Sequence, residues 1–378
     1  MLKTDNINIL KYEINSSQGD LKQTLKAIKN QDIKVSSKGI STDFGDATIP
    51  FYAFKDEIRQ NQQSIKDALK DIVSKVISTL DTKQKKSTAL IVGTSLIDWH
   101  LVDAINGCAY EYKKTNYTSK KHSIDSYAKE LASEFALNEF TMTINTACTS
   151  SANAMLEAKN LINCGVVDYA IVVGLEVFSP IMSSGFYAME LISQTDIKPF
   201  DANRDGLILG EAIGAILLGK DNSKWSLEGG FSNCNSATIT SVGADGKECV
   251  EVMQKALDDA NITTDDITAL KAHATGSNSN DLAEINAISK VFNPSITFTA
   301  LKPFVGHTIG ASGVLEIIIF ISCIDDGFIP KTLSCHTPIV QDYMPINEHK
   351  KCNGGVFMCN YFGFGGNNIS LIIKKENP

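Results

Sequence analysis

The sequence predicts an α/β protein built from two similar halves, and the order of its apolar segments is the basis of that prediction. The apolar runs at 88–95 and 166–176 are short and end in turn residues, as buried strands do, and a segment with helical spacing lies between them. Strand, helix and strand in this order predict a βαβ unit in a parallel or mixed sheet that is covered on both faces. The alternation begins again after about residue 238, so we expect halves at 1–238 and 239–378 with the functional site between them.

The other elements follow from the same periodicities. In chain order we expect an alternating segment at 6–12, helices at 60–80 and 151–163, a strand at 225–231, a helix at 246–260 and a strand at 267–272. A charged turn with a glycine-rich bend carries Asp201, Arg204, Asp205 and Glu211, which we expect to form a buried, hydrogen-bonded ion network with a structural role.

Composition excludes several classes of protein. With 43% hydrophobic and 21% charged residues, the chain is neither disordered nor fibrous in character. Nine cysteines without a paired CxxC spacing, and an amino terminus without a signal peptide, indicate a reducing cytoplasm and disfavour a disulfide framework or a metal site. A net charge of -8 disfavours nonspecific nucleic-acid binding.

The longest strongly apolar run extends from Val314 to Ile324 and contains Glu316. Its eleven residues are far fewer than the roughly 20 that a membrane span requires. We therefore expect a buried helix and no membrane span.

Cys148 lies at a predicted strand-to-helix turn, between the alternating segment at 140–146 and the helix at 151–163. The free N–H groups and the dipole of a helix N-terminus favour a thiolate, which makes this a suitable position for a nucleophile. A small buried hydrophobic residue, the commonest role of a free cysteine, is an equally good interpretation of this segment alone.

Three further motifs carry chemistry. His273 ends a predicted strand and is followed by Ala-Thr-Gly-Ser and by a helix with Asp281 and Glu284. His307 lies at another strand-to-helix turn, five residues after Lys302. The third motif, Asn-Tyr-Phe-Gly-Phe-Gly-Gly-Asn-Asn at 360–368, has glycines that permit a tight turn and expose N–H groups to an anion.

In this order, the four motifs resemble the β-ketoacyl-acyl-carrier-protein synthases of the elongating Cys-His-His type, in the thiolase superfamily. The resemblance covers roughly residues 88–374 and implies a five-layered αβαβα thiolase fold. It implies that Cys148 is the acyl-accepting nucleophile, that His273 and His307 are the catalytic histidines, and that Lys302 and Glu284 hold the two imidazoles in orientation. One departure lies at the amino terminus, where the first 85 residues do not show the opening strand and glycine turn expected of the family.

The resemblance also implies the surroundings of the nucleophile. Phe364 matches the gating phenylalanine, whose backbone N–H forms an oxyanion hole with that of Cys148. The expected substrate-binding residues are Thr275, Ser277, Phe362 and Gly365. Neither a metal nor an organic cofactor is implied.

The implied partners are acyl carrier protein and a second subunit. The family's dimer would form through the strand near 141–146, either with an identical chain or with a related synthase or chain-length factor. Because the carrier protein and this chain are both acidic, a local basic patch is needed, and Lys113, Lys114, Lys120 and Lys121 are the candidates.

The implied reaction is a decarboxylative Claisen condensation in fatty-acid or polyketide and polyene chain elongation. Two alternatives remain open at this stage. A chain-length-factor-like partner subunit normally lacks the nucleophile, and a cysteine hydrolase would not require two histidine motifs and the 360–368 turn.

Overall fold

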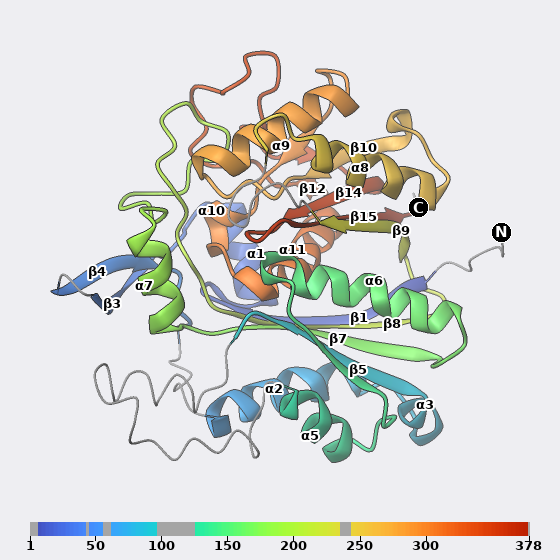
Figure 1. Ribbon diagram of the computed structural model, residues 1–378. Coiled ribbons are helices and arrows are strands. Elements are labelled where there is room, and N and C mark those ends of the chain that lie inside the picture. Colours follow the sequence, from blue (N-terminus) through green and yellow to red (C-terminus); the bar gives the residue numbers. More distant parts are fainter. Residues whose placement is uncertain (1–6, 43–44, 56–61, 97–124, 235–242, 377–378) are drawn as a thin grey trace.

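The computed structural model describes residues 7–42, 45–55, 62–96, 125–234 and 243–376. Its elements form five layers, with a helical layer between two sheets and further helices on the outer face of each sheet (Figure 1). The predicted five-layered α/β fold is confirmed.

The first sheet has the strand order β1-β8-β7-β5-β6. β5 is parallel to β6 and β7, whereas β8 runs antiparallel to both β7 and β1. β5, β7 and β8 are buried almost throughout, which explains why they appear in the sequence as continuous apolar runs rather than alternating ones. The strands are β1 (Ile7–Ser16), β5 (Thr88–Thr94), β6 (Thr141–Ile144), β7 (Tyr169–Glu176) and β8 (Ala212–Gly219).

The second sheet repeats the pattern with the order β9-β15-β14-β10-β11. β10 is parallel to β11 and β14, and β15 is antiparallel to β14 and β9. A short pairing between the ends of β1 and β9 joins the sheets at their edges. The strands are β9 (Trp225–Cys234), β10 (Ile267–Lys271), β11 (Phe298–Thr299), β14 (Gly355–Phe362) and β15 (Asn367–Lys375).

The matching strand orders indicate two architecturally similar halves. Because β9 pairs with β15 over its length, it belongs to the second sheet. We therefore place the start of the second half at Trp225, ahead of the predicted boundary between 238 and 239.

Helices pack with their apolar faces against the outer side of each sheet. α2 (Gln62–Ile77) and α5 (Ser126–Glu134) pack on the outer face of the first sheet. α8 (Lys247–Ala260) and α9 (Asn278–Val291) pack on the outer face of the second. The short α3 (Thr82–Lys86) begins at an Asp81 capping box and precedes β5.

The helical layer between the sheets consists of α1 (Leu21–Asn30), α6 (Ser150–Asn163) and α11 (Ser312–Asp325) (Figure 1). α11 is buried from Ser312 to Ile324, so the predicted buried helix is confirmed. None of the helices in the described ranges is both long and apolar enough to cross a membrane.

The expected absence of an opening strand is wrong. β1 pairs along its length with β8, and the chain then turns at Gly19, whose φ of 105° lies in the region that favours glycine. Strong alternation extends over only part of this strand, because four consecutive residues in its middle, 10–13, are half-buried. The sequence therefore shows a weak strand pattern here.

The smaller elements lie beside the layers. The β3–β4 hairpin and α7 pack together near the site, while the others form turns and short bridges. Their bounds are β2 (Gly19–Asp20), β3 (Ser36–Thr42), β4 (Gly45–Phe51), α7 (Pro180–Ala188), α10 (Lys302–Val305), β12 (Phe328–Ile329) and β13 (Lys350–Lys351).

The four charged residues of the turn do not form the expected ion network. Their side chains instead make hydrogen bonds mainly to backbone groups. Asp201 accepts hydrogen bonds from three backbone N–H groups, and Glu211 accepts from those of Phe54 and Phe178. Arg204 donates to three carbonyl groups, and Asp205 accepts from the Ser193 hydroxyl. These side chains therefore fix loop conformations, which is the structural role expected of them.

Candidate active site

Cys148 lies in a single 3₁₀ turn, Ala147–Thr149, between β6 and α6. The preceding residue, Ala147, has a φ of 54°, an unusual value for a residue with a side chain. This sharp turn places Cys148 at the N-terminal end of α6, where it is 2% exposed. The predicted strand-to-helix position is confirmed.

His273 follows β10, and its backbone is fixed by Glu284 of α9. The two Glu284 carboxylate oxygens accept hydrogen bonds from the backbone N–H groups of His273 at 2.8 Å and Ala274 at 2.7 Å. Ala274 has a φ of 48°, so the carboxylate stabilises a turn that most residues avoid. The expectation that Glu284 orients an imidazole is corrected, because its hydrogen bonds go to the backbone.

His307 lies between α10 and the 3₁₀ turn Ile309–Ala311. Its backbone N–H donates to the Ile208 carbonyl at 2.8 Å, which ties it to the glycine-rich segment before β8. Its Nε2 lies 3.1 Å from Cys148 Sγ, and its Nδ1 lies 3.3 Å from the hydroxyl of Ser312. The imidazole is therefore within direct proton-transfer distance of the thiol.

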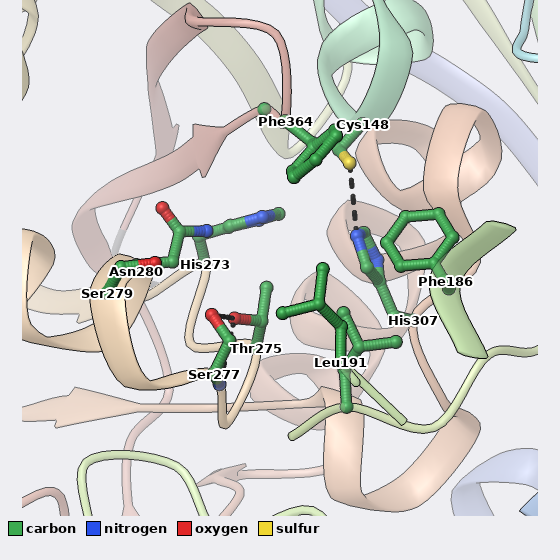
Figure 2. A pocket seen from close by; sticks show the side chains of 12 residues that line it. Cys148, Phe186, Leu191, His273, Thr275, Ser277, Ser279, Asn280, His307 and Phe364 are labelled. Carbon is green, nitrogen blue, oxygen red and sulfur yellow. Dashed lines mark hydrogen bonds between the residues drawn. The ribbon is translucent and has the colours of Figure 1, made fainter. Parts of the chain in front are cut away.

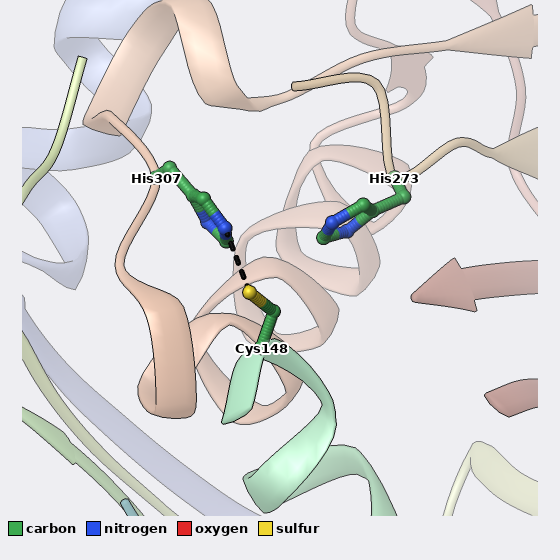
Figure 3. Close-up of side chains that lie close together, drawn as sticks. All are labelled: Cys148, His273 and His307. Atoms are coloured by element: carbon green, nitrogen blue, oxygen red, sulfur yellow. Dashed lines mark hydrogen bonds between the residues drawn. The ribbon is translucent and has the colours of Figure 1, made fainter. Parts of the chain in front are cut away.

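The three side chains meet between the two halves, Cys148 coming from the first and both histidines from the second (Figure 3). One nitrogen or sulfur atom from each lies within 4.8 Å of the others. The two imidazole rings are 5.3 Å apart and nearly perpendicular. The structure thus brings together three residues that are far apart in the sequence.

Lys302 determines which nitrogen of His273 carries the proton. Its Nζ lies 3.3 Å from His273 Nδ1, and an ammonium group can only donate. Nδ1 must therefore accept, which leaves the proton on Nε2. Nε2 is buried and has no hydrogen-bond partner among the described residues.

Both imidazoles are neutral in the resting protein. Burial is the largest cause that holds the pKa of His273 well below its usual range, followed by the Lys302 ammonium. Burial and Lys302 likewise hold the pKa of His307 well below its usual range. His273 therefore presents an Nε2–H donor without a formal positive charge.

The pKa of the Cys148 thiol is higher than the sequence led us to expect. Burial raises its pKa to about 11, although the backbone N–H of Phe364, the Lys302 ammonium and its own backbone N–H act in the opposite direction. Backbone N–H groups thus lower the pKa in the expected direction, but desolvation of the charged form outweighs them and the thiol form is favoured. The backbone N–H groups of Phe364 and Cys148 are directed at the sulfur.

A cavity opens in front of these groups (Figure 2). Thr275 and Ser277 line it and are hydrogen-bonded to each other at 2.9 Å. Phe362 and Gly365 are not part of its wall, and Phe362 is fully buried beside His273. Phe364 is part of the wall, and its ring lies 5.8 Å from that of Phe186.

Sequence reasoning missed several wall residues and two buried charges. The missed wall residues are Phe186, Leu191, Leu207, Ser279, Asn280 and Gly363. Glu316 accepts from Lys302 at 2.6 Å and from Lys271 at 2.5 Å, and all three side chains are fully buried. A carboxylate within an otherwise apolar helix was the available signal for Glu316.

The cluster could also be considered as a metal site, because one thiol and two imidazoles lie close together. Tetrahedral zinc would separate sulfur and nitrogen ligands by about 3.5 Å. The observed 3.1 Å between Cys148 Sγ and His307 Nε2 fits a direct hydrogen bond better. The neighbouring Lys302 ammonium also disfavours a divalent cation.

Comparisons with known proteins agree with this arrangement. The family model for the N-terminal domain of β-ketoacyl synthases matches residues 53–224, and the model for the C-terminal domain matches residues 226–336. The two matches together cover most of the chain and leave out only its two ends. The chain belongs to the β-ketoacyl synthase family.

Curated relatives of this family member are 3-oxoacyl-[acyl-carrier-protein] synthases. A chloroplastic synthase I from Arabidopsis thaliana is 34% identical over 66% of this chain and 56% of its own length. A putative mitochondrial synthase from Schizosaccharomyces pombe is 29% identical over 78% of this chain and 76% of its own length. The matched part is only a little more than half of the first two relatives.

Solved structures show the same fold. A chain of a ketosynthase–chain length factor complex from Xenorhabdus doucetiae superposes with a TM-score of 0.82, 22% identity and coverage of 100% of this chain and 99% of that chain. A β-ketoacyl synthase from Burkholderia phymatum has a TM-score of 0.84, 20% identity and coverage of 99% and 100%. The thiolase fold includes both halves of the described part of the chain.

Proposed function

We propose that this protein is a β-ketoacyl-acyl-carrier-protein synthase that performs decarboxylative Claisen condensation. The observation that carries the proposal is one cavity in which a thiol contacts His307 while the unpartnered Nε2–H of His273 remains available for a substrate oxygen. A nucleophile and a separate neutral donor are what the two halves of a condensation require.

In the first half-reaction, Cys148 Sγ attacks the carbonyl carbon of an acyl thioester and its proton passes to His307 Nε2. The backbone N–H groups of Cys148 and Phe364 stabilise the tetrahedral oxyanion, where a single donor of this kind contributes on the order of 3 kcal/mol. The carbon–sulfur bond to the carrier thiol breaks, and the carrier thiol leaves with the proton from His307.

In the second half-reaction, a malonyl thioester binds with its carbonyl oxygen near His273 and His307. Cleavage of the bond to the carboxylate releases CO₂, and the electron pair forms an enolate. The enolate oxygen accepts a hydrogen bond from His273 Nε2–H, and a second one from His307 after its neutral imidazole has taken the tautomer with the proton on Nε2. The enolate carbon then attacks the acyl carbon on Cys148, and the cysteine sulfur is released. Neither a metal nor an organic cofactor takes part in these steps.

We test the proposal with purified protein and one acyl thioester. Intact-mass analysis should detect an acyl adduct on the parent and none on Cys148→Ala. Addition of malonyl-carrier protein should then release a chain that is longer by two carbons. Release of free acid without elongation would instead indicate a hydrolase, and absence of an adduct on the parent would indicate a partner subunit similar to a chain-length factor.

Acyl carrier protein and a second synthase subunit are the proposed partners. The candidate docking residues Lys113, Lys114, Lys120 and Lys121 lie outside the described residues. Reversal of two of these charges should slow turnover of carrier-protein substrates and leave small thioester analogues unaffected. Equal slowing of both substrate types would argue against docking there.

The cytoplasm is our proposed compartment. The described part of the chain contains eight cysteines and no disulfide, as expected in a reducing environment. The pathway, fatty-acid or polyketide and polyene synthesis, follows from the acyl chain accepted in the experiment above.

A further inference from the structure

Lys271 is a fully buried lysine two residues before His273. Ala269 of the same strand packs in the core between the two sheets, and strand side chains alternate, so Lys271 and His273 face that core as well. The intervening Ala272 packs on the opposite side, against the outer helices. An ammonium group therefore lies within the layer that also carries the proposed catalytic residues.

Every contact of this ammonium leads to a part of the site. Lys271 Nζ donates to Glu316 Oε2 at 2.5 Å and to the backbone carbonyl of Asn360 at 2.9 Å, and it lies 3.5 Å from the centre of the Tyr361 ring. Asn360 and Tyr361 are the β14 residues that lead into the turn with Phe364. Lys271 thus joins the strand before the oxyanion-hole turn to Glu316 of α11.

Glu316 divides its two oxygens between two lysines. Oε2 is held by Lys271, and Oε1 accepts from Lys302 at 2.6 Å. Lys302 in turn reaches His273 Nδ1 at 3.3 Å. The result is a continuous chain of contacts from Lys271 through Glu316 and Lys302 to the imidazole.

Without Lys271, the second oxygen of Glu316 would be buried without a partner. An unpaired buried carboxylate oxygen is costly, so Lys302 would be drawn toward both oxygens and away from His273 Nδ1. Nδ1 could then carry the proton itself, leaving Nε2 unable to donate to a substrate oxygen. The net charge of the buried lysine–glutamate–lysine group would also fall from one positive charge to zero.

We propose that Lys271 is a positioning residue for the condensation, which acts through Glu316 and Lys302 to keep His273 in the neutral Nε2–H form. This inference rests on the proposed function and extends it to a residue that does not line the cavity. Lys271 does not touch the substrate in this scheme. Its effect is on the proton position and the charge state of His273.

The pH dependence follows from the charges around His273. The titratable groups near it are Lys271, Lys302, His307, Cys148, the Tyr361 phenol and, at its backbone, Glu284, with Glu316 acting through Lys302. Removal of the Lys271 charge makes protonation of the imidazole easier. A protonated imidazole still donates from Nε2, but its Nδ1 can no longer accept from the Lys302 ammonium, so the ring loses the contact that holds it in place. Decarboxylation of malonyl thioester should therefore fall at a higher pH as the solution is acidified.

The test compares three variants of the full-length protein. Lys271→Met removes the ammonium. Lys159→Met is the matched control, because Lys159 is also a buried lysine, 3% exposed, that pairs with a carboxylate. It lies in the C-terminal part of α6, and its partner is Asp259 of α8. Glu316→Gln removes the negative charge instead and leaves two ammonium groups. The readouts are the pH profile of malonyl decarboxylation, the nitrogen chemical shifts of labelled His273 and the rate of Cys148 acylation.

We expect Lys271→Met to move the acidic limb of the decarboxylation profile to higher pH by about one unit, the usual size of one nearby charge. The nitrogen shifts of His273 should show loss of the Nε2–H form, whereas acylation of Cys148, which uses His307, should change less. Glu316→Gln should move the limb to lower pH, because an extra net positive charge opposes protonation. Lys159→Met should leave both the limb and the nitrogen shifts unchanged.

An unchanged profile and unchanged His273 nitrogen shifts in Lys271→Met would overturn the inference and leave Lys271 a structural residue. If that variant does not fold, a Glu316→Gln profile that fails to move to lower pH has the same meaning. The nitrogen shifts do not depend on turnover. A parent protein that does not decarboxylate malonyl thioester but shows the expected His273 shifts would therefore contradict the proposed function and not the positioning role.

Discussion

At the scale of single residues, the main electrostatic feature of the site is that Cys148, His273 and His307 are all uncharged in the resting protein. Burial is the first cause in each case, because it disfavours the thiolate and both imidazolium ions. Charge therefore appears only when substrate reacts, next to donors that are already in place.

The two half-reactions require different residues, and substitutions should separate them. Cys148→Ala should abolish acyl-enzyme formation and condensation but retain measurable release of CO₂ from malonyl thioester. His307→Ala should slow decarboxylation by about 100-fold or more, the value of one preorganised donor. Decarboxylation by His307→Ala at the parental rate, measured as CO₂ release, would refute the assigned role of the histidine pair.

The raised pKa of Cys148 predicts its reactivity toward alkylating agents. Since burial raises the pKa to about 11, the thiolate fraction should increase about tenfold per pH unit between pH 7 and 10. The iodoacetamide rate at Cys148, followed by intact mass with Cys148→Ala as background, should rise over this range without a plateau. A plateau already present at pH 7 would instead reveal a resting thiolate–imidazolium pair with His307.

At the scale of elements, the site depends on how closely α6 and α11 approach. A Cβ atom on Gly313 of α11 would lie 2.2 Å from the backbone nitrogen of Ala152 in α6, so only glycine permits this contact. Cys148 lies in the 3₁₀ turn that immediately precedes α6, and Ser312 of α11 contacts His307. The distance between the helices therefore controls the distance between sulfur and imidazole.

Gly313→Ala should lower the free energy of unfolding by about 1–3 kcal/mol, the usual cost of overpacking a core. Gly185→Ala is the matched control, since Gly185 also lies in a helix, α7, and a Cβ there would meet nothing within 4 Å. The control should be stabilised by roughly 0.5–1 kcal/mol, because alanine favours a helix over glycine. Urea unfolding measures both variants, and equal effects would refute the close-contact argument.

At the scale of the whole molecule, β6 is the outermost strand of the first sheet and its outer edge has no partner strand in the described ranges. Its four residues are only half-buried, and the Thr143 hydroxyl oxygen is buried without a hydrogen-bond partner in the described chain. An exposed strand edge is a ready surface for pairing with another chain. These features fit the expected dimer through the strand near 141–146.

Thr143→Lys should therefore weaken subunit association, because it introduces a charge at the proposed interface. Thr48→Lys is the control, since Thr48 is exposed in β4, which forms a separate two-stranded sheet with β3. Sedimentation equilibrium of the parent and both variants gives the dissociation constants. A dimer that tolerates Thr143→Lys as well as it tolerates Thr48→Lys would have to use another surface.

The sequence by itself determined the elements and the reactive groups. Periodic apolar residues mark α6, α8 and the buried strands, because each segment must bury its own apolar face wherever it packs. Cys148, His273 and His307 were identifiable because each occurs in a short motif at a turn. The opening strand β1 was missed, since half-buried residues interrupt its alternation.

Only the tertiary structure decided which buried charges meet and what their proton states are. Lys271 and Glu316 are 45 residues apart, and their contact depends on how α11 packs against the end of β10. The position of Glu284 against the backbone, rather than against an imidazole, likewise follows from the path of α9. Burial reversed the expected ionisation of Cys148, because desolvation depends on the full set of surrounding atoms, whereas a local motif specifies only the helix N-terminus.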